Sequence, residues 1–533
     1  MPRRRPGPRL SLDLAPSRLA APLLQRCLPS ALRRRHGPAI AEMLARADMV
    51  ATGQDDTARS QRGAVLAFAI RMASAFIAYL SQVLIAWWLG AGEYGIFVWV
   101  WTALIVISLL ASLGFPSAAV RFVAQYGALG QGDLLRGFLR GSRLLAFLAG
   151  TLVALAGAVG VHAFAHPIES PYVAVLVLGL VCLPVMCLGN VQDGIARARD
   201  WIDLALGATF LVRPLLMLAF MAGALAFGLE AGARVAILAA IAACWVTTAW
   251  QLAVMQRRLA RVVEPGARAY PLRRWLAVAL PIFLVEGFYQ LLVNVDILIV
   301  ALFVPPEQVA VYFAVVKTLA LAHFVHYAVK AGAAHRYASY HSTGDVRAFR
   351  RLTAQTARWT FWPTLAVAVA LLLFGRWLLA LFGPGFEAGY PLLFIVAFGV
   401  IVRATVGPAE AVLTMTGHQN VCAALYGTSL LVNIVLNFAL IPIFGLMGAA
   451  MATAIAMTFE TVALYAAMQR RLGLSMSAFA RAGTGGGARP ERASGKRWSA
   501  AACRARRFPT SPSRFLVRRA GRSNWRRRRP CRV

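Results

Sequence analysis

The sequence predicts an all-α, polytopic membrane protein with about twelve transmembrane helices. Of the 533 residues, 59% are hydrophobic and only 14% are charged, whereas soluble domains are about 45–50% apolar and about 25% charged. The apolar residues gather in runs long enough to cross a bilayer, and arginines gather in every second loop between the runs. The same composition excludes a disordered chain, because disorder requires low hydrophobicity.

Twelve apolar runs have the length of a spanning helix, which needs about 20 residues. The last run ends sharply at Gln469-Arg470-Arg471. The predicted helices cover residues 64–89, 95–118, 144–166, 172–190, 201–228, 235–255, 275–303, 308–330, 359–382, 389–416, 421–443 and 446–468.

The loops between the runs alternate in charge, which predicts the orientation of the helices. Short cytoplasmic loops of membrane proteins carry an excess of Lys and Arg. With the N-terminus in the cytoplasm, the inner loops hold 18 basic residues and the outer loops hold only Arg234. Both termini are therefore predicted to be cytoplasmic. The inner-loop cations are Arg121, Arg136, Arg140, Arg143, Arg197, Arg199, Arg257, Arg258, Arg261, Arg268, Arg273, Arg274, Lys330, Arg336, Arg347, Arg350, Arg351 and Arg358.

An internal repeat divides the predicted helices into two sets of six. The spacing from Leu84-Ile85 to Glu93 recurs from Leu298-Ile299 to Glu307. The offset spans six helices, an even number, so the two copies keep the same orientation in the membrane. We therefore predict two parallel six-helix lobes. The first lobe is residues 63–255, the cytoplasmic loop between the lobes is 256–274, and the second lobe is 275–470.

Basic segments extend beyond the lobes at both ends and contribute much of the net charge of +34. Residues 1–62 form a basic cytoplasmic extension, and residues 471–533 form an Arg-rich tail. Next to a membrane, such segments suit anionic lipid headgroups, so membrane lipid, and not nucleic acid, is the predicted partner. The tail also has the composition of a GC-rich gene read out of frame, so it fits either a frameshift artefact or a functional basic tail.

Motifs along the membrane body resemble those of the polysaccharide flippases. The segment from Leu89 to Phe97, LGAGEYGIF, is similar to their "LG..EYG.Y" turn between helices 1 and 2. Asp296-Ile297-Leu298-Ile299, with the later stretch from Val311 to Lys317, is similar to "D.ilig … G.Y..A.k", although Ala310 replaces a usual Gly. The stretch from Asn433 to Ala450 is similar to their helix 11–12 junction. The resemblance covers residues 62–470.

These flippases belong to the multidrug/oligosaccharidyl-lipid/polysaccharide exporter superfamily. The resemblance implies a MATE-like fold with a V-shaped cavity between two lobes, open alternately to either side. It also implies Wzx-type transport of polyprenyl-diphosphate-linked oligosaccharide across the bacterial inner membrane, for O-antigen, capsule or exopolysaccharide (surface polysaccharide) export. The implied partners are this glycolipid, membrane lipid, H+ or Na+ as a driving ion, and polysaccharide assembly proteins.

Charged and polar residues lie within several predicted helices, where a charge costs at least a few kcal/mol and usually faces a cavity. Arginine binds phosphate oxygens bidentately and lysine binds them as a point charge. Deep cations therefore suit the diphosphate of the implied substrate, and amides suit its sugars. The six cavity candidates are Arg71, Arg213, Lys317, Arg403, Asn433 and Asn437.

Other interpretations of these polar residues remain open. Glu286 and Asp296 are either salt-bridge partners of the deep cations or a site for a coupling ion. Asn433 and Asn437 suit helix packing as well as sugar binding. The seven cysteines form no CxxC pair and no Cys/His cluster at metal spacing, so neither a metal nor a cofactor is predicted.

The eighth predicted helix carries four basic or titratable residues. His326 and Lys330 follow His323 by three and seven residues, so these three side chains share one face of the helix. Lys317 is expected to point elsewhere. The histidines suit helix–helix hydrogen bonds or a proton relay, and Lys330 suits a snorkelling position at the inner helix end.

Two other functions remain open for the chain. A MATE-like multidrug exporter would have the same fold, but a cationic drug favours an acidic cavity, and the predicted membrane core has at least as many cations as acids. A membrane-embedded polysaccharide polymerase or ligase usually needs a large outer loop, and all predicted outer loops are short. We therefore predict a flippase rather than an enzyme, with no catalytic residues.

Overall fold

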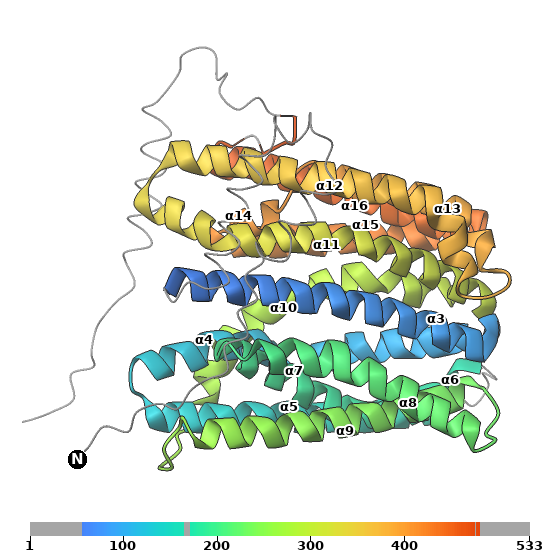
Figure 1. Ribbon diagram of the computed structural model, residues 1–533, viewed down its shortest axis with the longest axis horizontal. Coiled ribbons are helices and arrows are strands. Elements are labelled where there is room, and N and C mark those ends of the chain that lie inside the picture. Colours follow the sequence, from blue (N-terminus) through green and yellow to red (C-terminus); the bar gives the residue numbers. More distant parts are fainter. Residues whose placement is uncertain (1–55, 165–170, 475, 480–533) are drawn as a thin grey trace, which may run out of the picture.

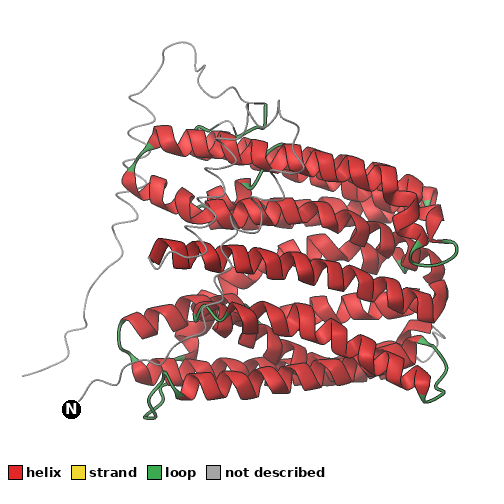
Figure 2. Ribbon diagram, viewed as in Figure 1, coloured by secondary structure: helices red, strands yellow, loops and turns green. Residues whose placement is uncertain are grey.

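The computed structural model describes residues 56–164, 171–474 and 476–479. These residues form long helices that lie side by side, and no strand occurs among them (Figures 1 and 2). Eleven of the described helices are long and apolar enough to cross a membrane. The prediction of an all-α, polytopic membrane protein is thus confirmed.

The helices follow the predicted order. The elements are α3 (Asp56–Ala111), α4 (Phe115–Ala128), α5 (Gly132–Phe164), α6 (Pro171–Gly179), η1 (Leu180–Cys182), α7 (Leu183–Ala198), η2 (Asp203–Val212), α8 (Arg213–Ala226), α9 (Ala233–Ala260), α10 (Leu272–Val300), α11 (Pro306–Thr343), α12 (Val346–Ala380), η3 (Phe386–Gly389), α13 (Tyr390–Ala404), α14 (Ala409–Met415), α15 (Gln419–Phe444) and α16 (Leu446–Leu472).

The first two predicted helices account for the difference between twelve and eleven. The first lies in α3, and the second lies mostly in α3 and ends in α4. Helix α3 is helical on either side of a sharp kink at Gly90. The ribbon of α3 runs to one end of the bundle and turns back there (Figure 1). Gly90 has φ 72°, a left-handed value that glycine adopts without the steric cost of a Cβ. The connection is therefore one residue, where the sequence predicted a longer loop.

Three of the predicted helices are interrupted. The fourth consists of α6, η1 and α7, the fifth begins as the π-helix η2 and continues as α8, and the tenth is split into α13 and α14. Within a bilayer, broken helices are tolerated only where protein or a cavity satisfies the freed backbone groups. These interruptions therefore mark places where function is to be sought.

The two sets of helices meet in an aromatic cluster at the Gly90 end of the bundle. Tyr94 packs with its ring centroid 6.1 Å from those of both Phe313 and Phe386. The turns of the internal repeat also touch, because a Cβ on Gly95 would lie 1.8 Å from the carbonyl oxygen of Pro306. One continuous hydrophobic core spans both sets here, so this end of the molecule is closed.

At the opposite end, α10 links the two sets. Its first turn is buried in the core of the first set, where Trp275 Nε1 donates to Tyr126 Oη (3.2 Å), whereas its later part packs along α15. The preceding loop is held by Arg136, which donates to the carbonyls of Glu264 and Ala267.

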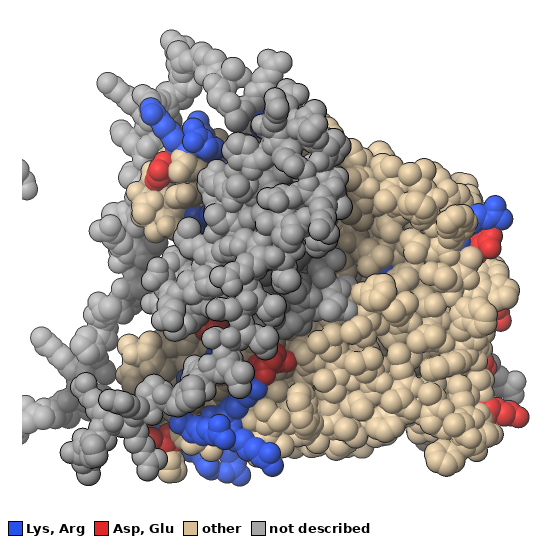
Figure 3. Space-filling model, in the orientation of Figure 1, with Lys and Arg blue, Asp and Glu red and all other residues tan. Residues whose placement is uncertain are grey.

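Charged side chains lie mainly at the two ends of the bundle. On the face drawn in Figure 3, Lys, Arg, Asp and Glu atoms gather at either end and a broad uncharged band separates them. Such a band is what a multi-pass membrane protein presents to lipid. The exposed arginines at the end opposite Gly90 include Arg257, Arg261, Arg268, Arg273 and Arg274.

Candidate functional site

A cavity of about 250 Å³ lies within the second set of helices. Its walls come from α10, α11, α12, α13, α14, α15 and α16, and they combine an apolar surface with ionisable groups of both signs. The cationic side chains are Lys317, Lys330 and Arg403, the acidic ones are Asp296, Glu410 and Glu460, and the histidines are His323 and His326.

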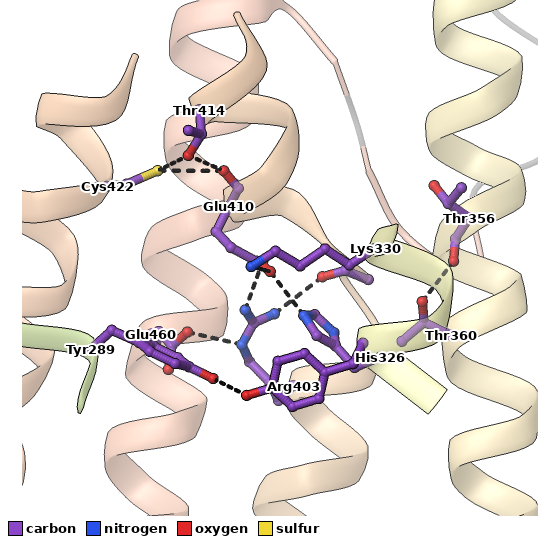
Figure 4. A network of polar contacts seen from close by, with 12 residues as sticks. Tyr289, His326, Lys330, Thr356, Thr360, Arg403, Glu410, Thr414, Cys422 and Glu460 are labelled. Atoms are coloured by element: carbon purple, nitrogen blue, oxygen red, sulfur yellow. Dashed lines mark hydrogen bonds and ion pairs between the residues drawn. The ribbon is translucent and has the colours of Figure 1, made fainter. Parts of the chain in front are cut away.

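Glu410 is the centre of an ion-pair network in this cavity (Figure 4). Its Oε1 lies 2.8 Å from His326 Nε2 and 3.4 Å from Lys330 Nζ, and its Oε2 lies 2.9 Å from Arg403 Nη2. The side chain is only 7% exposed. Three basic groups from two helices therefore compensate one buried carboxylate.

Arg403 connects Glu410 to a second buried acid. Its Nε donates to Glu460 Oε1 (2.9 Å), and its Nη1 donates to the carbonyl oxygen of Gly407 (3.1 Å). All three nitrogens of the guanidinium are thus engaged within the protein. The network is a set of buried salt bridges whose opposite charges compensate one another. Removing one partner from such a network leaves an uncompensated buried charge.

The break between α13 and α14 positions this network. Gly407 has φ 59°, and a Cβ on it would lie 2.8 Å from Ala357 Cα, so a larger residue would be both strained and obstructed. The turn frees the Gly407 carbonyl for Arg403 and directs Glu410 into the cavity. A discontinuous helix beside a cavity is the usual architecture of transporter binding sites.

Replacing Arg403 is expected to reveal the structural part of this network. Arg403→Gln leaves Glu410 and Glu460 without their shared partner, and breaking a buried pair costs about 3–5 kcal/mol. We therefore expect a clear fall in the thermal unfolding temperature of the purified protein. The matched control is Arg376→Gln, because Arg376 pairs with Glu387 but is 71% exposed, and exposed ion pairs contribute little to stability. Equal unfolding temperatures for the two variants would contradict the geometry of the network.

Lys317 is the exception among the cavity cations, since it forms no ion pair or hydrogen bond with any described residue. Its Nζ lies 4.8 Å from the centroid of the Phe313 ring, in cation–π contact. Lys317 lies on a different sector of α11 from His323, His326 and Lys330, as expected from the spacing, and all four residues nevertheless line the same cavity. The cavity follows a wide sector of α11, and the flexible lysine stem reaches it.

Asp296 lies at the edge of the cavity nearest the Gly90 end. Its Oδ2 accepts hydrogen bonds from Tyr312 Oη (2.8 Å) and Thr453 Oγ1 (3.2 Å), and its Oδ1 accepts from the Ile297 backbone N–H (3.0 Å). No described cation forms a salt bridge with it. A buried carboxylate held only by neutral donors is compatible with a role in binding a small cation.

The two predicted asparagines lie one turn apart on α15. Asn437 Nδ2 donates to Asn433 Oδ1 (3.0 Å) and to the Asn433 carbonyl (2.9 Å). Asn433 lines the cavity. Asn437 Oδ1 is buried and has no hydrogen-bond partner among the described residues, which leaves one acceptor available.

The remaining predicted site residues lie elsewhere. Glu286 accepts a hydrogen bond of 2.5 Å from Ser117 Oγ of α4, so it joins the two sets of helices and does not line the main cavity. Arg213 lies in the first set, near Gly189 and Thr248. Arg71 is on α3, but its side chain lies outside the described part of the structure. The cavity thus brings together Lys317, Arg403, Asn433 and Asp296.

The sequence did not assign His326, Lys330, Glu410 or Glu460 to the site. The available signals were the shared face of His326 and Lys330, and Glu410 directly after the Gly407-Pro408 break. A polar residue after a helix break within an apolar run indicates a side chain directed into a cavity. Glu460 lies within the unbroken helix α16, so no helix break indicated that its side chain faces a cavity.

The comparisons with known proteins agree with this architecture. The MatE family model matches residues 281–439. Among curated proteins, none matches the sequence. The inward-facing conformation of a multidrug resistance MATE family transporter of the MOP superfamily aligns with TM-score 0.60 at 15% identity, over 76% of this chain and 98% of that one.

Two further solved structures give similar alignments. The outward-facing conformation of a multidrug resistance MATE family transporter of the MOP superfamily gives TM-score 0.55 at 16% identity, over 75% of this chain and 93% of that one. The lipid II flippase MurJ in an inward closed conformation gives TM-score 0.56 at 13% identity, over 76% of this chain and 87% of that one. The chain is therefore a multi-pass membrane protein with the fold shared by MATE transporters and this flippase.

Proposed function

We propose that the protein flips a polyprenyl-diphosphate-linked oligosaccharide from the inner to the outer leaflet of a bacterial inner membrane. The observation that carries this proposal is the unpaired Lys317 ammonium in the cavity of the second lobe. A cation at membrane depth that forms no ion pair is costly. The nearby Asp296 carboxylate acts on it only at a distance, and a transported anion would compensate it while bound. The diphosphate of the glycolipid is such an anion.

Lys330 marks the mouth of the same path. Its side chain is 42% exposed and its contact with Glu410 is 3.4 Å, a loose and solvent-accessible ion pair. The 13 residues between Lys317 and Lys330 correspond to about 20 Å along α11. A phosphate group can therefore exchange with Glu410 at the mouth and then move to Lys317, while the polyprenyl chain stays in lipid.

Arg403 and Arg71 have different places in this proposal. Arg403 is occupied by Glu410 and Glu460, so it shapes the cavity and is not the first group to meet the phosphate. Arg71 and Arg213 remain predicted substrate contacts from the first lobe. Asn433, which lines the cavity, remains the predicted contact to the sugars together with Asn437.

A driving ion is assigned to Asp296 in preference to Glu286. Asp296 is 3% exposed, lines the cavity and accepts hydrogen bonds only from neutral donors. Glu286 is engaged with Ser117 between the lobes. H+ or Na+ binding at Asp296 would couple the cavity to an ion gradient.

The proposed orientation places the closed, Gly90 end outside and the arginine-rich end in the cytoplasm. It follows from the excess of basic residues in the predicted inner loops. We expect an Arg268→Cys variant to resist a membrane-impermeant thiol reagent in intact cells and to react after the cells are opened. Arg268 is exposed, so the loss of reactivity would reflect the membrane and not burial. Rapid labelling of intact cells would reverse the orientation.

A MATE-like multidrug exporter is the second candidate, and one observation favours it: Asp296, Glu410 and Glu460 equal the three cavity cations in number. A cationic drug could use these acids. Disruption of the gene separates the two functions. The flippase proposal expects lipid-linked oligosaccharide to accumulate and surface glycan to disappear, with unchanged susceptibility to cationic dyes. Greater dye susceptibility with normal surface glycan would favour the exporter.

A further inference from the structure

The first set of helices contains a second, half-buried polar cluster, centred on Asp193 of α7. Asp193 Oδ1 accepts a hydrogen bond from Gln251 Nε2 of α9 (2.6 Å), and Oδ2 accepts one from Thr209 Oγ1 of η2 (2.7 Å). The Gln251 amide also donates to the Leu204 carbonyl (3.1 Å). One carboxylate therefore holds three transmembrane segments together, and both of its side-chain donors are neutral.

No charged side chain among the described residues forms a salt bridge with Asp193. Arg213 of α8 and Arg197 of α7 are close enough to act on it electrostatically, and Arg197 Nε donates to the Asp193 backbone carbonyl. Most other charged groups on the packed helices are engaged or exposed. Arg143 contacts Met255, Asp203 pairs with Arg258, Glu93 accepts from the Ala233 N–H, and Arg121, Arg140 and Arg257 are exposed. Arg199, directly after α7, is half-buried, and its Nε has no hydrogen-bond partner among the described residues.

The segment that Thr209 anchors is irregular. It is the ten-residue π-helix Asp203–Val212, and π-helical turns occur frequently at functional sites. The segment leads directly into Arg213, whose Nε is buried and has no hydrogen-bond partner among the described residues. Because Thr209 and Arg213 are four residues apart, a change in the anchor of Thr209 is transmitted to Arg213.

Gly189 and Thr248 lie beside this arginine. A Cβ on Gly189 would meet Thr248 Oγ1 at 3.4 Å and Arg213 Nη2 at 3.7 Å. Thr248 is 1% exposed, and its hydroxyl makes no hydrogen bond, although Thr318 and Thr453 each donate to the carbonyl four residues earlier. The polar groups around Arg213 are therefore unsatisfied in the present packing, and a modest shift of η2 would change their partners.

We propose that Asp193 is a reversible proton-binding site that controls the packing of η2 and, through it, the position of Arg213. In the ionised form, both oxygens accept charge-assisted hydrogen bonds, which are about twice as strong as neutral ones. A proton bound to one oxygen turns that oxygen into a donor, so its bond from Thr209 or Gln251 is weakened. The net reaction is addition of H+ to a carboxylate, with no redox change.

A metal ion fits this site less well than a proton. Both carboxylate oxygens already face donor hydrogens of Thr209 and Gln251, and the positive Arg213 lies nearby. A metal ion would need acceptor oxygens in these places. The proposal depends on the transport function only in the role of Arg213, because proton binding at Asp193 is independent of the substrate.

Infrared difference spectroscopy of the protein in lipid, without substrate, tests the site directly. Titration with acid should produce the C=O stretching band of a protonated carboxyl group, and Asp193→Asn should remove one component of that band. Thr209→Val removes a donor to the ionised form, so the Asp193 component should persist to a pH about one to two units higher. Thr209→Ser is the matched control, because it retains the hydroxyl, and it should titrate like the wild type.

The spectra of Asp193→Asn and Thr209→Val each test the site, provided that the variant is folded. If Asp193→Asn is poorly folded, the comparison of Thr209→Val with Thr209→Ser still decides. Unchanged spectra for both Asp193→Asn and Thr209→Val would overturn the proton site. A proton site confirmed in a protein that moves no glycolipid would leave this inference standing and reject only the proposed function.

Discussion

The Lys317→Ala variant is expected to insert normally and to lose about ten- to a hundredfold of its transport rate. A hydrogen bond to a charged group contributes about 1.5–3 kcal/mol. Lys317 forms no ion pair or hydrogen bond with a described residue that its removal would break, although the Asp296 carboxylate is close enough to act on it electrostatically. Its loss should therefore affect the substrate and not the fold. The measurement is the ratio of lipid-linked oligosaccharide to surface glycan in cells that express each variant at equal levels.

Two controls make this prediction specific. Lys317→Arg retains the charge at the same position and should keep more activity than Lys317→Ala. The thermal unfolding temperature of Lys317→Ala should stay near that of the wild type, in contrast to Arg403→Gln. Normal surface glycan in a well-expressed Lys317→Ala variant would rule out this lysine as the cation that holds the diphosphate.

A single methyl group at Gly95 is expected to abolish transport by preventing closure of the Gly90 end. In the closed arrangement, a Cβ on Gly95 would lie 1.8 Å from the Pro306 carbonyl oxygen and 2.5 Å from its carbonyl carbon. Backbone atoms cannot withdraw as a flexible side chain can, so the two repeat turns must separate. Gly95→Ala should therefore favour the conformation that is open at this end.

Gly92→Ala is the matched control for this closure. The nearest atom to its added Cβ is Glu307 Oε1, at 2.9 Å, which is the end of a flexible side chain. We expect Gly92→Ala to transport nearly normally. Spin labels placed on either side of the contact should report a larger separation in Gly95→Ala than in Gly92→Ala. Equal separations in the two variants would contradict the assigned role of this contact.

Much of the fold could be predicted from the sequence because a bilayer restricts the choices. Each crossing needs about 20 apolar residues, and arginines mark the ends of the runs. The sequence predicts local departures from regular helix less well. The one-residue turn at Gly90, the π-helix before Arg213 and the break at Gly407 depend on packing between helices that are distant in sequence.

The candidate site was predictable in its composition but not in its pairing. Of the polar residues singled out at membrane depth, Lys317, Arg403, Asp296 and Asn433 line the cavity, and their roles there stay predictions. The sequence could not separate the free Lys317 from the occupied Arg403, because Arg403 meets Glu460 across 57 residues and two helices. Lys317 illustrates a further limit: helical spacing gives the direction of a Cβ, whereas a long side chain can reach around the helix.

The central claim is that this protein moves a lipid-linked diphosphate, and a reconstituted vesicle assay tests it most directly. The purified protein would be placed in vesicles with a fluorescent polyprenyl-diphosphate glycolipid, and a membrane-impermeant quencher would report the fraction in the outer leaflet. Our account predicts that wild-type protein accelerates quenching of this lipid, that Lys317→Ala slows it about ten- to a hundredfold, and that a fluorescent lipophilic cation is not transported. Transport of the cation with no movement of the glycolipid would contradict it.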